Sequence, residues 1–275
     1  MPSKAVDLEK RFRKLGVKSF KPGFYDDQAF MEAERSNPKL LEEYAKYVSR
    51  RPNTDIYEAN TRDIVSRLLN IIDEATANAP RGSCRDSAAV LSRMLDRLGV
   101  WNFTVQGSFN IAVDGMGDEG RRFLWFDDEL DPGAGVRGHQ WVVAPPYRIL
   151  DASVRWQGWK DHVSAAISGP IATEEASSTK IRAVDVYPEK VLFEAKVLHG
   201  LSEAELLKHY RPDVKEFYGI VPPLTFRRGA VEYRYIPVGI TASEEPLEDI
   251  AGTTLRPKEI WDNVVVSEFA EQLSL

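Results

Sequence analysis

The sequence predicts an α+β fold, because helix-forming segments come first in the chain and strand-forming segments follow. Residues 1–80 carry apolar side chains at three- and four-residue spacing, which is typical of amphipathic helices. From residue 103 onward the chain is rich in β-branched and aromatic residues, separated by turn sequences, which favours antiparallel strands. Helices followed by an antiparallel sheet make up the α+β class.

The helical region contains two long amphipathic segments. These are "DDQAFMEAERSNPKLLEEYAKYVSRR" (26–51) and "TDIYEANTRDIVSRLLNIIDEATANA" (54–79). In the second, Thr54 or Asp55 is suited to cap the helix N-terminus. The predicted buried stripe of this helix consists of Ile56, Ile64, Leu68, Ile71 and Ile72. "NAPRGS" (78–83) then ends the helical pattern.

The next helix is predicted to begin at the only cysteine of the chain, Cys84. Ser83 is a preferred N-cap residue, and Asp86 stands three residues later, which is the spacing of a capping box. Cys84 then lies in the first turn, where unpaired backbone N–H groups and the helix dipole favour a thiolate. The structural alternative is a buried cysteine on the apolar stripe Cys84, Ala88, Leu91, Leu95 and Leu98.

Four strands are predicted after this helix. They are "FTVQGSFNIAV" (103–113), "RFLWF" (122–126), "HQWVVA" (139–144) and "YRILDAS" (147–153), with a turn at "DGMGDEG" and another at Pro145 and Pro146. If the last two strands pair, His139 and Asp151 lie at the same end of adjacent strands. The carboxylate can then hold one imidazole nitrogen and leave the other to face a thiolate, which is the order of groups that an activated cysteine requires.

The C-terminal third carries no chemical motif. "SGPIATEEASSTK" (168–180) is small and polar and predicts a loop or linker. Beyond it, "SEAELLKHY" predicts a short helix with a capping box from Ser202 to Glu205, and "FRRGAVEYRYIPVGI" (226–240) predicts a pair of strands. The predicted division is a helical region at 1–77, a core at 78–168, and a mixed α/β extension at 169–275 that can pack with the core as one domain.

The composition of the chain argues against several classes of function, including nucleic-acid binding and metal binding. The 36 basic and 42 acidic residues give a net charge of −6, which argues against a nucleic-acid or anionic-membrane surface. The sequence contains no run of 18 apolar residues, and its start lacks the apolar stretch of a secretory signal. One cysteine cannot form an internal disulfide, so we expect a cytoplasmic protein. Its scattered histidines and lone cysteine argue against a metal site, and we expect no cofactor.

Three segments resemble motifs of one family. "GSCRDSAAVLSRMLDRLGVWNFTVQGSFN" (82–110) is similar to the nucleophile segment of the transglutaminase-like superfamily, "GHQWVV" (138–143) to its histidine motif, and "RILDAS" (148–153) to its aspartate motif. The resemblance covers about residues 78–156. It implies a papain/transglutaminase-like core, in which a nucleophile helix packs on an antiparallel β-sheet. It also implies that Cys84 is the nucleophile, His139 the base and acid, and Asp151 the residue that orients the imidazole.

Further candidates follow from the same comparison. Arg85 stands where animal transglutaminases have an aromatic residue, and no calcium-site pattern is visible, which argues against a calcium-dependent crosslinker. Asn78 is a weaker candidate for an oxyanion donor than the backbone N–H of Cys84. Ser83 and Trp141 are weak candidates for substrate contacts, and core packing is the favoured alternative for Trp141. The acidic stretch "FDDELDPG" (126–133) is either a solvated loop or a rim that favours a cationic substrate.

These features together predict a thiol-dependent hydrolase that forms an acyl-enzyme from an amide or peptide bond. Its substrate is a protein, a peptide or a small amide. Transfer of the acyl group to an amine, as in a transglutaminase or an acyltransferase, is one alternative. A non-enzymatic transglutaminase-like binding module is the other, and the sequence leaves the oligomeric state open.

Overall fold

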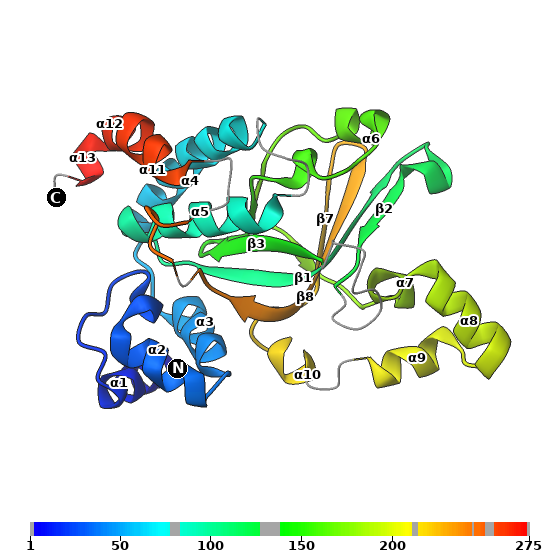
Figure 1. Cartoon of the computed structure of the whole chain (residues 1–275), viewed down its shortest axis with the longest axis horizontal. Coiled ribbons are helices and arrows are strands. Elements are labelled where there is room, and N and C mark those ends of the chain that lie inside the picture. Colours follow the sequence, from blue (N-terminus) through cyan, green and yellow to red (C-terminus); the bar gives the residue numbers. More distant parts are fainter. Residues whose placement is uncertain are drawn as a thin grey trace.

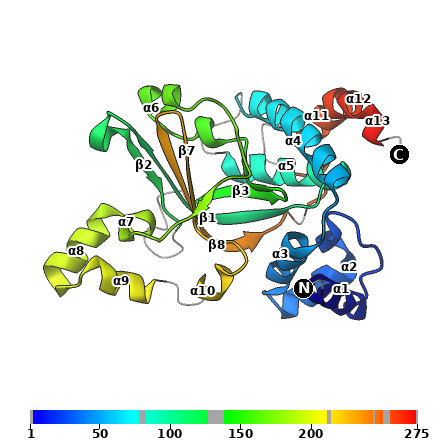
Figure 2. The same ribbon diagram turned by 180° about the vertical axis from the view of Figure 1, so that it is seen from behind.

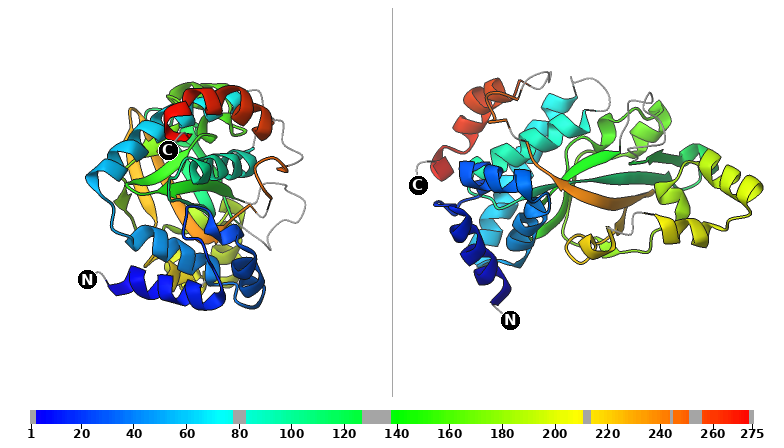
Figure 3. Two further views of the ribbon diagram at one scale, coloured as in Figure 1. Left: turned by 90° about the vertical axis from the view of Figure 1, so that its left-hand side faces the viewer. Right: turned by 60° about the horizontal axis from the view of Figure 1, so that its bottom comes forward.

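A curled antiparallel sheet forms the centre of the computed structural model, which describes residues 3–77, 83–126, 138–210, 214–243, 245–250 and 256–273. The strand order is β5-β4-β3-β1-β8-β7-β6, and β2 also pairs with β1. Every pair in this sheet is antiparallel. Figure 3 shows the sheet from two further directions. The predicted α+β class is confirmed.

Each strand that the sequence predicts is present close to its predicted position. Their bounds are β1 Phe103–Val113, β2 Arg121–Leu124, β3 His139–Ala144, β4 Tyr147–Asp151, β5 Ile171–Thr173, β6 Ser177–Ser178, β7 Leu224–Arg228 and β8 Val231–Thr241. The prediction of a loop at 168–180 is wrong, because this segment supplies β5 and β6, which pair with β4 and β7. Since β8 lies between β1 and β7, the sheet extends across the boundary placed at residue 168.

The helices are grouped around this sheet (Figure 1). The helices are α1 Ser3–Leu15, α2 Gln28–Ser36, α3 Leu40–Arg50, α4 Asp55–Thr76, α5 Cys84–Arg97, α6 Asp161–Ala166, α7 Ala183–Val186, α8 Glu189–His199, α9 Glu203–His209, α10 Val214–Phe217, α11 Pro257–Ile260, α12 Val266–Glu268 and α13 Ala270–Leu273. Helices α1–α3 lie at one end of the molecule, and α8 and α9 lie at the other. Seen from behind, α4 lies beside α5 (Figure 2).

Helix α4 has the N-cap that the sequence predicts, because the side chain of Thr54 accepts a hydrogen bond from the backbone N–H of Tyr57 at 3.2 Å. Most of the predicted stripe is also buried, including Ile64 and Leu68. The prediction for Ile56 is wrong, since this side chain is 75% exposed. It lies in the first turn of α4, ahead of the stretch that enters the core.

Strand β3 separates two apolar clusters because its side chains alternate between the faces of the sheet. Val142 and Ala144 pack with α4 and α5 on one face. Trp141 and Val143 face a larger core on the other side, which also contains Phe109 of β1. His139 follows the alternation of Trp141 and stacks on Phe109, with 4.7 Å between ring centroids. His139 at the start of β3 is therefore packed against the larger core.

A buried polar cluster joins the C-terminal part of α5 to the N-terminal helices. Asp96 accepts hydrogen bonds from Tyr25 Oη at 2.9 Å and from Asn102 Nδ2 at 2.8 Å. Burial raises the pKa of Asp96 to about 8, although Tyr25, Arg93 and Asn102 act in the opposite direction. This carboxyl therefore keeps its proton in the folded protein at pH values where an unfolded chain has lost it.

We expect Asp96 to make the protein less stable as the pH rises. An aspartate in the unfolded chain ionises near pH 3.9, roughly, so between that pH and about 8 the folded state holds a proton that the unfolded state releases. Stability must fall with pH across this interval. Asp96→Asn should flatten the dependence, and exposed Asp118→Asn should leave it unchanged. Thermal unfolding at a series of pH values measures the slope, and an identical slope in Asp96→Asn would contradict this assignment.

Candidate active site

Cys84 is the first residue of α5, as the helical pattern predicts, and its side chain is 9% exposed. Its backbone N–H therefore has no acceptor within the helix. Ser83 occupies the N-cap position, but its side chain makes no cap hydrogen bond, so the predicted capping box with Asp86 is wrong. The Ser83 Oγ atom is buried and has no partner among the described residues. Backbone N–H groups in the first turn of α5 are therefore not capped by the Ser83 side chain and remain able to donate to a ligand.

The hairpin of β3 and β4 brings His139 and Asp151 together. The two strands pair antiparallel through the turn at Pro145 and Pro146, which places the start of β3 beside the end of β4. His139 Nε2 lies 2.6 Å from Asp151 Oδ2, and both side chains are almost fully buried. The contact expected from strand pairing is therefore present.

His139 stands where one edge of β1 changes partners. The first half of β1 pairs with β3 and the second half with β2, and His139 is opposite Gly107 at the change. A Cβ atom on Gly107 would lie 2.0 Å from Ile236 O. Gly138 has a φ of +76°, and a Cβ atom there would lie 2.5 Å from Gly107 O. Two glycines therefore allow the chain to reach the position at which His139 begins β3.

Four hydrogen bonds fix the carboxylate of Asp151. Besides His139, Tyr235 Oη donates to Oδ2 at 2.8 Å, and the N–H and hydroxyl of Ser153 each donate to Oδ1 at 3.0 Å. Gln157 Nε2 in turn donates to Ser153 O. Tyr235 was not among the predicted site residues, because it comes from β8, far along the chain. Its only signal was its place in the predicted strand pair 226–240.

The electrostatics of the pair favour an imidazolium and a carboxylate. Burial alone raises the pKa of Asp151, but the His139 charge and the hydrogen bonds from His139, Tyr235 and Ser153 outweigh burial and lower it. Burial alone lowers the pKa of His139. The charge and hydrogen bond of Asp151 outweigh burial, and Cys84 adds to them, so the pKa of His139 is raised. Both shifts therefore favour a protonated imidazole beside an ionised carboxylate.

Cys84 is the third member of this group. His139 Nδ1 has no hydrogen-bond partner of regular geometry among the described residues, yet Cys84 interacts with the ring closely enough to raise its pKa. The structure thus joins His139 to Asp151 by a hydrogen bond, and Cys84 lies near enough to affect the pKa of His139 without a regular hydrogen bond to the ring. A loose contact between nucleophile and base is common in unliganded enzymes and tightens when substrate binds.

The weaker site candidates are placed differently. Trp141 is 1% exposed and packs against Tyr235 with ring centroids 5.0 Å apart, which agrees with core packing, and its contact with substrate stays a prediction. The alternation along β3 turns this side chain into the core. Asn78 and residues 127–133 of the acidic stretch lie outside the described residues. Within the described ranges, no group of three or more His, Cys, Asp or Glu side chains is arranged to hold a metal ion.

A cavity of about 650 Å³ lies beside the first turns of α5, where Cys84 begins the helix. Its wall is mainly polar and includes Arg85, Gln140 and Thr241. Arg85 directly follows Cys84, and Gln140 directly follows His139. Neither Cys84 nor His139 itself lines the cavity, so it adjoins the three residues and does not contain them.

Searches of family models, of curated proteins and of solved structures give no significant match to this chain. The resemblance to transglutaminase-like enzymes therefore rests on the three sequence motifs. In the part of the chain that the structure describes, no helix combines the length and apolar character needed to cross a membrane.

Proposed function

We propose that this protein is a thiol-dependent hydrolase that acts on an amide or peptide bond, with a papain/transglutaminase-like core. One observation carries the proposal. His139 Nε2 lies 2.6 Å from Asp151 Oδ2, and Cys84, in the first turn of α5, contributes to the raised pKa of His139. Nucleophile, base and orienting residue occur in the order that covalent catalysis requires. A reducing cytoplasm would keep the single thiol free for this role.

The chemistry proceeds in two steps. The Cys84 thiolate attacks the substrate carbonyl carbon, and the resulting oxyanion accepts a hydrogen bond from the backbone N–H of Cys84. The His139 imidazolium gives its Nδ1 proton to the leaving nitrogen as the C–N bond breaks, which leaves a thioester on Cys84. Water then attacks the thioester and passes a proton to His139, and the C–S bond breaks to release the acid. Asp151 keeps the Nε2 proton in place throughout.

The burial of His139 and Asp151 argues against a purely structural role for them. Removing an imidazolium and a carboxylate from water carries a penalty of several kcal/mol, roughly, for each ion. A binding module has no use for such a pair beside a cysteine. An acyl-enzyme does pass its acyl group to an amine when an amine takes the place of water, so the product distinguishes hydrolysis from transfer.

The experiment that tests the proposal uses p-nitrophenyl acetate, an activated acyl donor that places few demands on the binding site. We expect a burst of p-nitrophenolate, and intact-protein mass spectrometry should find one acetyl group on Cys84. Cys84→Ala should show neither. Added glycinamide should leave acetate as the main product if the enzyme is a hydrolase, and give acetylglycinamide if it is a transferase. A burst of equal size in Cys84→Ala would overturn the proposal.

A further inference from the structure

The wall of the cavity beside α5 offers one cation and several unused hydrogen-bonding groups. The side chains of Arg85, Thr104, Gln140 and Thr241 all line it. Among the described residues, none of these four side chains has a hydrogen bond or an ion pair. Thr104 is almost fully buried, with only 4% of the residue exposed, and it still lines the cavity. A ligand in the cavity would supply a hydrogen-bond partner for the Thr104 hydroxyl.

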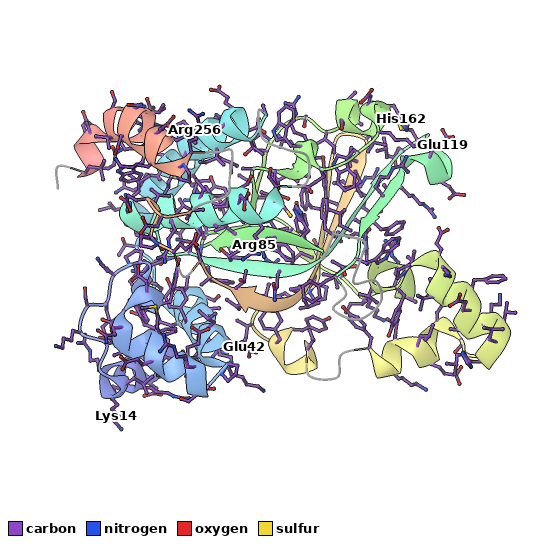
Figure 4. The ribbon with its side chains drawn as sticks, in the orientation of Figure 1. Lys14, Glu42, Arg85, Glu119, His162 and Arg256 are labelled. Atoms are coloured by element: carbon purple, nitrogen blue, oxygen red, sulfur yellow. The ribbon has the colours of Figure 1, made fainter. Side chains whose placement is uncertain are left out.

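The register of the sheet explains why these polar groups gather. Thr104 of β1 is opposite Thr241 of β8, and Gln140 of β3 is opposite Gln106 of β1. Alternation therefore places Thr104, Thr241 and Gln140 on the face of the sheet that α5 covers. Arg85 reaches the same cavity from the first turn of α5 and lies near α5 and β3 in Figure 4.

Arg93 holds another part of the cavity wall in place through hydrogen bonds to the backbone. Arg93 donates from its guanidinium to Ser243 O at 2.7 Å and to Glu245 O at 3.2 Å, and it pairs with Asp26 at 2.9 Å. Ser243 and Glu245 both line the cavity. Since Arg93 belongs to α5 and is almost fully buried, it holds Ser243 and Glu245 against this helix. The cavity wall that these two residues form is therefore fixed in place.

The guanidinium of Arg85 indicates which ligand the cavity favours. Its charged lining residues are Arg85, Asp86 and Glu245. Asp86 and Glu245 each have other partners, whereas Arg85 has none among the described residues. A guanidinium flanked by hydroxyl and amide groups matches the geometry of a carboxylate.

We infer that the substrate of Cys84 carries a carboxylate, which Arg85 binds in this cavity with help from Thr104, Gln140 and Thr241. The inference rests on the proposed function, because it assigns the substrate class of the same site. Arg85 follows Cys84 directly in the first turn of α5, so a carboxylate bound to Arg85 lies on the Cys84 side of the cavity. The preferred substrate is therefore an amide whose acyl part ends in an acid.

Matched esters test this inference. The p-nitrophenyl half-esters of adipate, pimelate and suberate end in a carboxylate, and the corresponding monoamides are neutral and of equal length. We expect one of the acids to acylate Cys84 about 10-fold faster than its amide, the size of a hydrogen-bonded charge contact at a partly exposed site. Arg85→Gln should bring the ratio of acid to amide close to one. Arg35→Gln on α2 removes the same charge elsewhere and should change nothing. Salt should reduce the wild-type ratio.

Two results would overturn the inference, and they are distinguishable. If the neutral esters acylate Cys84 but Arg85→Gln keeps the wild-type ratio of acid to amide, the proposed function stands and the carboxylate site fails. If no ester of either kind acylates Cys84, the proposed function fails and the substrate assignment fails with it. Circular dichroism of Arg85→Gln and Arg35→Gln shows whether each variant retains the fold; both positions are exposed, so we expect both to do so.

Discussion

Asp151→Asn should leave the fold intact and lower the rate of acylation by about 10²–10⁴, the range seen when the orienting carboxylate of a triad is neutralised. The asparagine amide has one acceptor and one donor end. Either orientation sets its NH₂ group against a donor, which is the backbone N–H of Ser153 or the Nε2–H of His139. The expected loss of stability is about 1–3 kcal/mol, the cost of one unsatisfied buried group.

The pH profile shows whether Asp151 acts through His139. Loss of the carboxylate removes the main cause of the raised pKa of His139, so this pKa should fall in Asp151→Asn. The pH dependence of p-nitrophenyl acetate acylation should shift with it. Tyr235→Phe removes one hydrogen bond from the same carboxylate but keeps its charge, so its rate should fall by about 10-fold. An unchanged rate and profile in Asp151→Asn would show that Asp151 does not orient His139.

Gly138→Ala should abolish most activity, although this residue carries no reactive group. Alanine at a φ of +76° costs about 1–2 kcal/mol, and its Cβ would lie 2.5 Å from Gly107 O. The chain must shift, and His139 is the next residue. A displacement of roughly 1 Å at a reacting group costs on the order of 10² in rate.

Gly115→Ala is the matched control for this substitution. Gly115 has a φ of +78°, but nothing lies within 4 Å of the Cβ position, so the backbone strain is similar and the clash is absent. We expect Gly115→Ala to lose stability and keep its acylation rate, and Gly138→Ala to lose both. The p-nitrophenyl acetate burst and thermal unfolding measure the two quantities. Equal rates in the two variants would mean that Gly138 does not position His139.

Local patterns account for most of the elements that were predicted. Strands β1 and β3 occupy the residues whose composition favours strands, and Thr54 caps α4 because its side chain accepts from a neighbouring N–H. Strands β5 and β6 were missed because their sequence is polar and short, and they form only by pairing with β4 and β7. Pairing with distant residues overrides weak local preference.

The same distinction applies to the site. His139 and Asp151 were predicted to meet because a hairpin joins them, so their contact depends on residues close in sequence. Tyr235 and the cavity beside α5 depend on the pairing of β8 with β1, which the sequence does not specify without knowledge of the sheet order. Trp141 was left with two uses, because the composition of a strand does not show which of its faces meets the core, and the structure places it in the core.

Alkylation of Cys84 by iodoacetamide tests the central claim most directly, because the protein has no other thiol. Cys84 is only 9% exposed, so a structural cysteine would react more slowly in the native protein than in urea. If His139 activates Cys84, native protein at neutral pH should react faster than unfolded protein, and His139→Ala should lose at least about 10-fold of that rate, since one charged neighbour is removed. Native protein that resists iodoacetamide until it unfolds, with no effect of His139→Ala, would contradict the account.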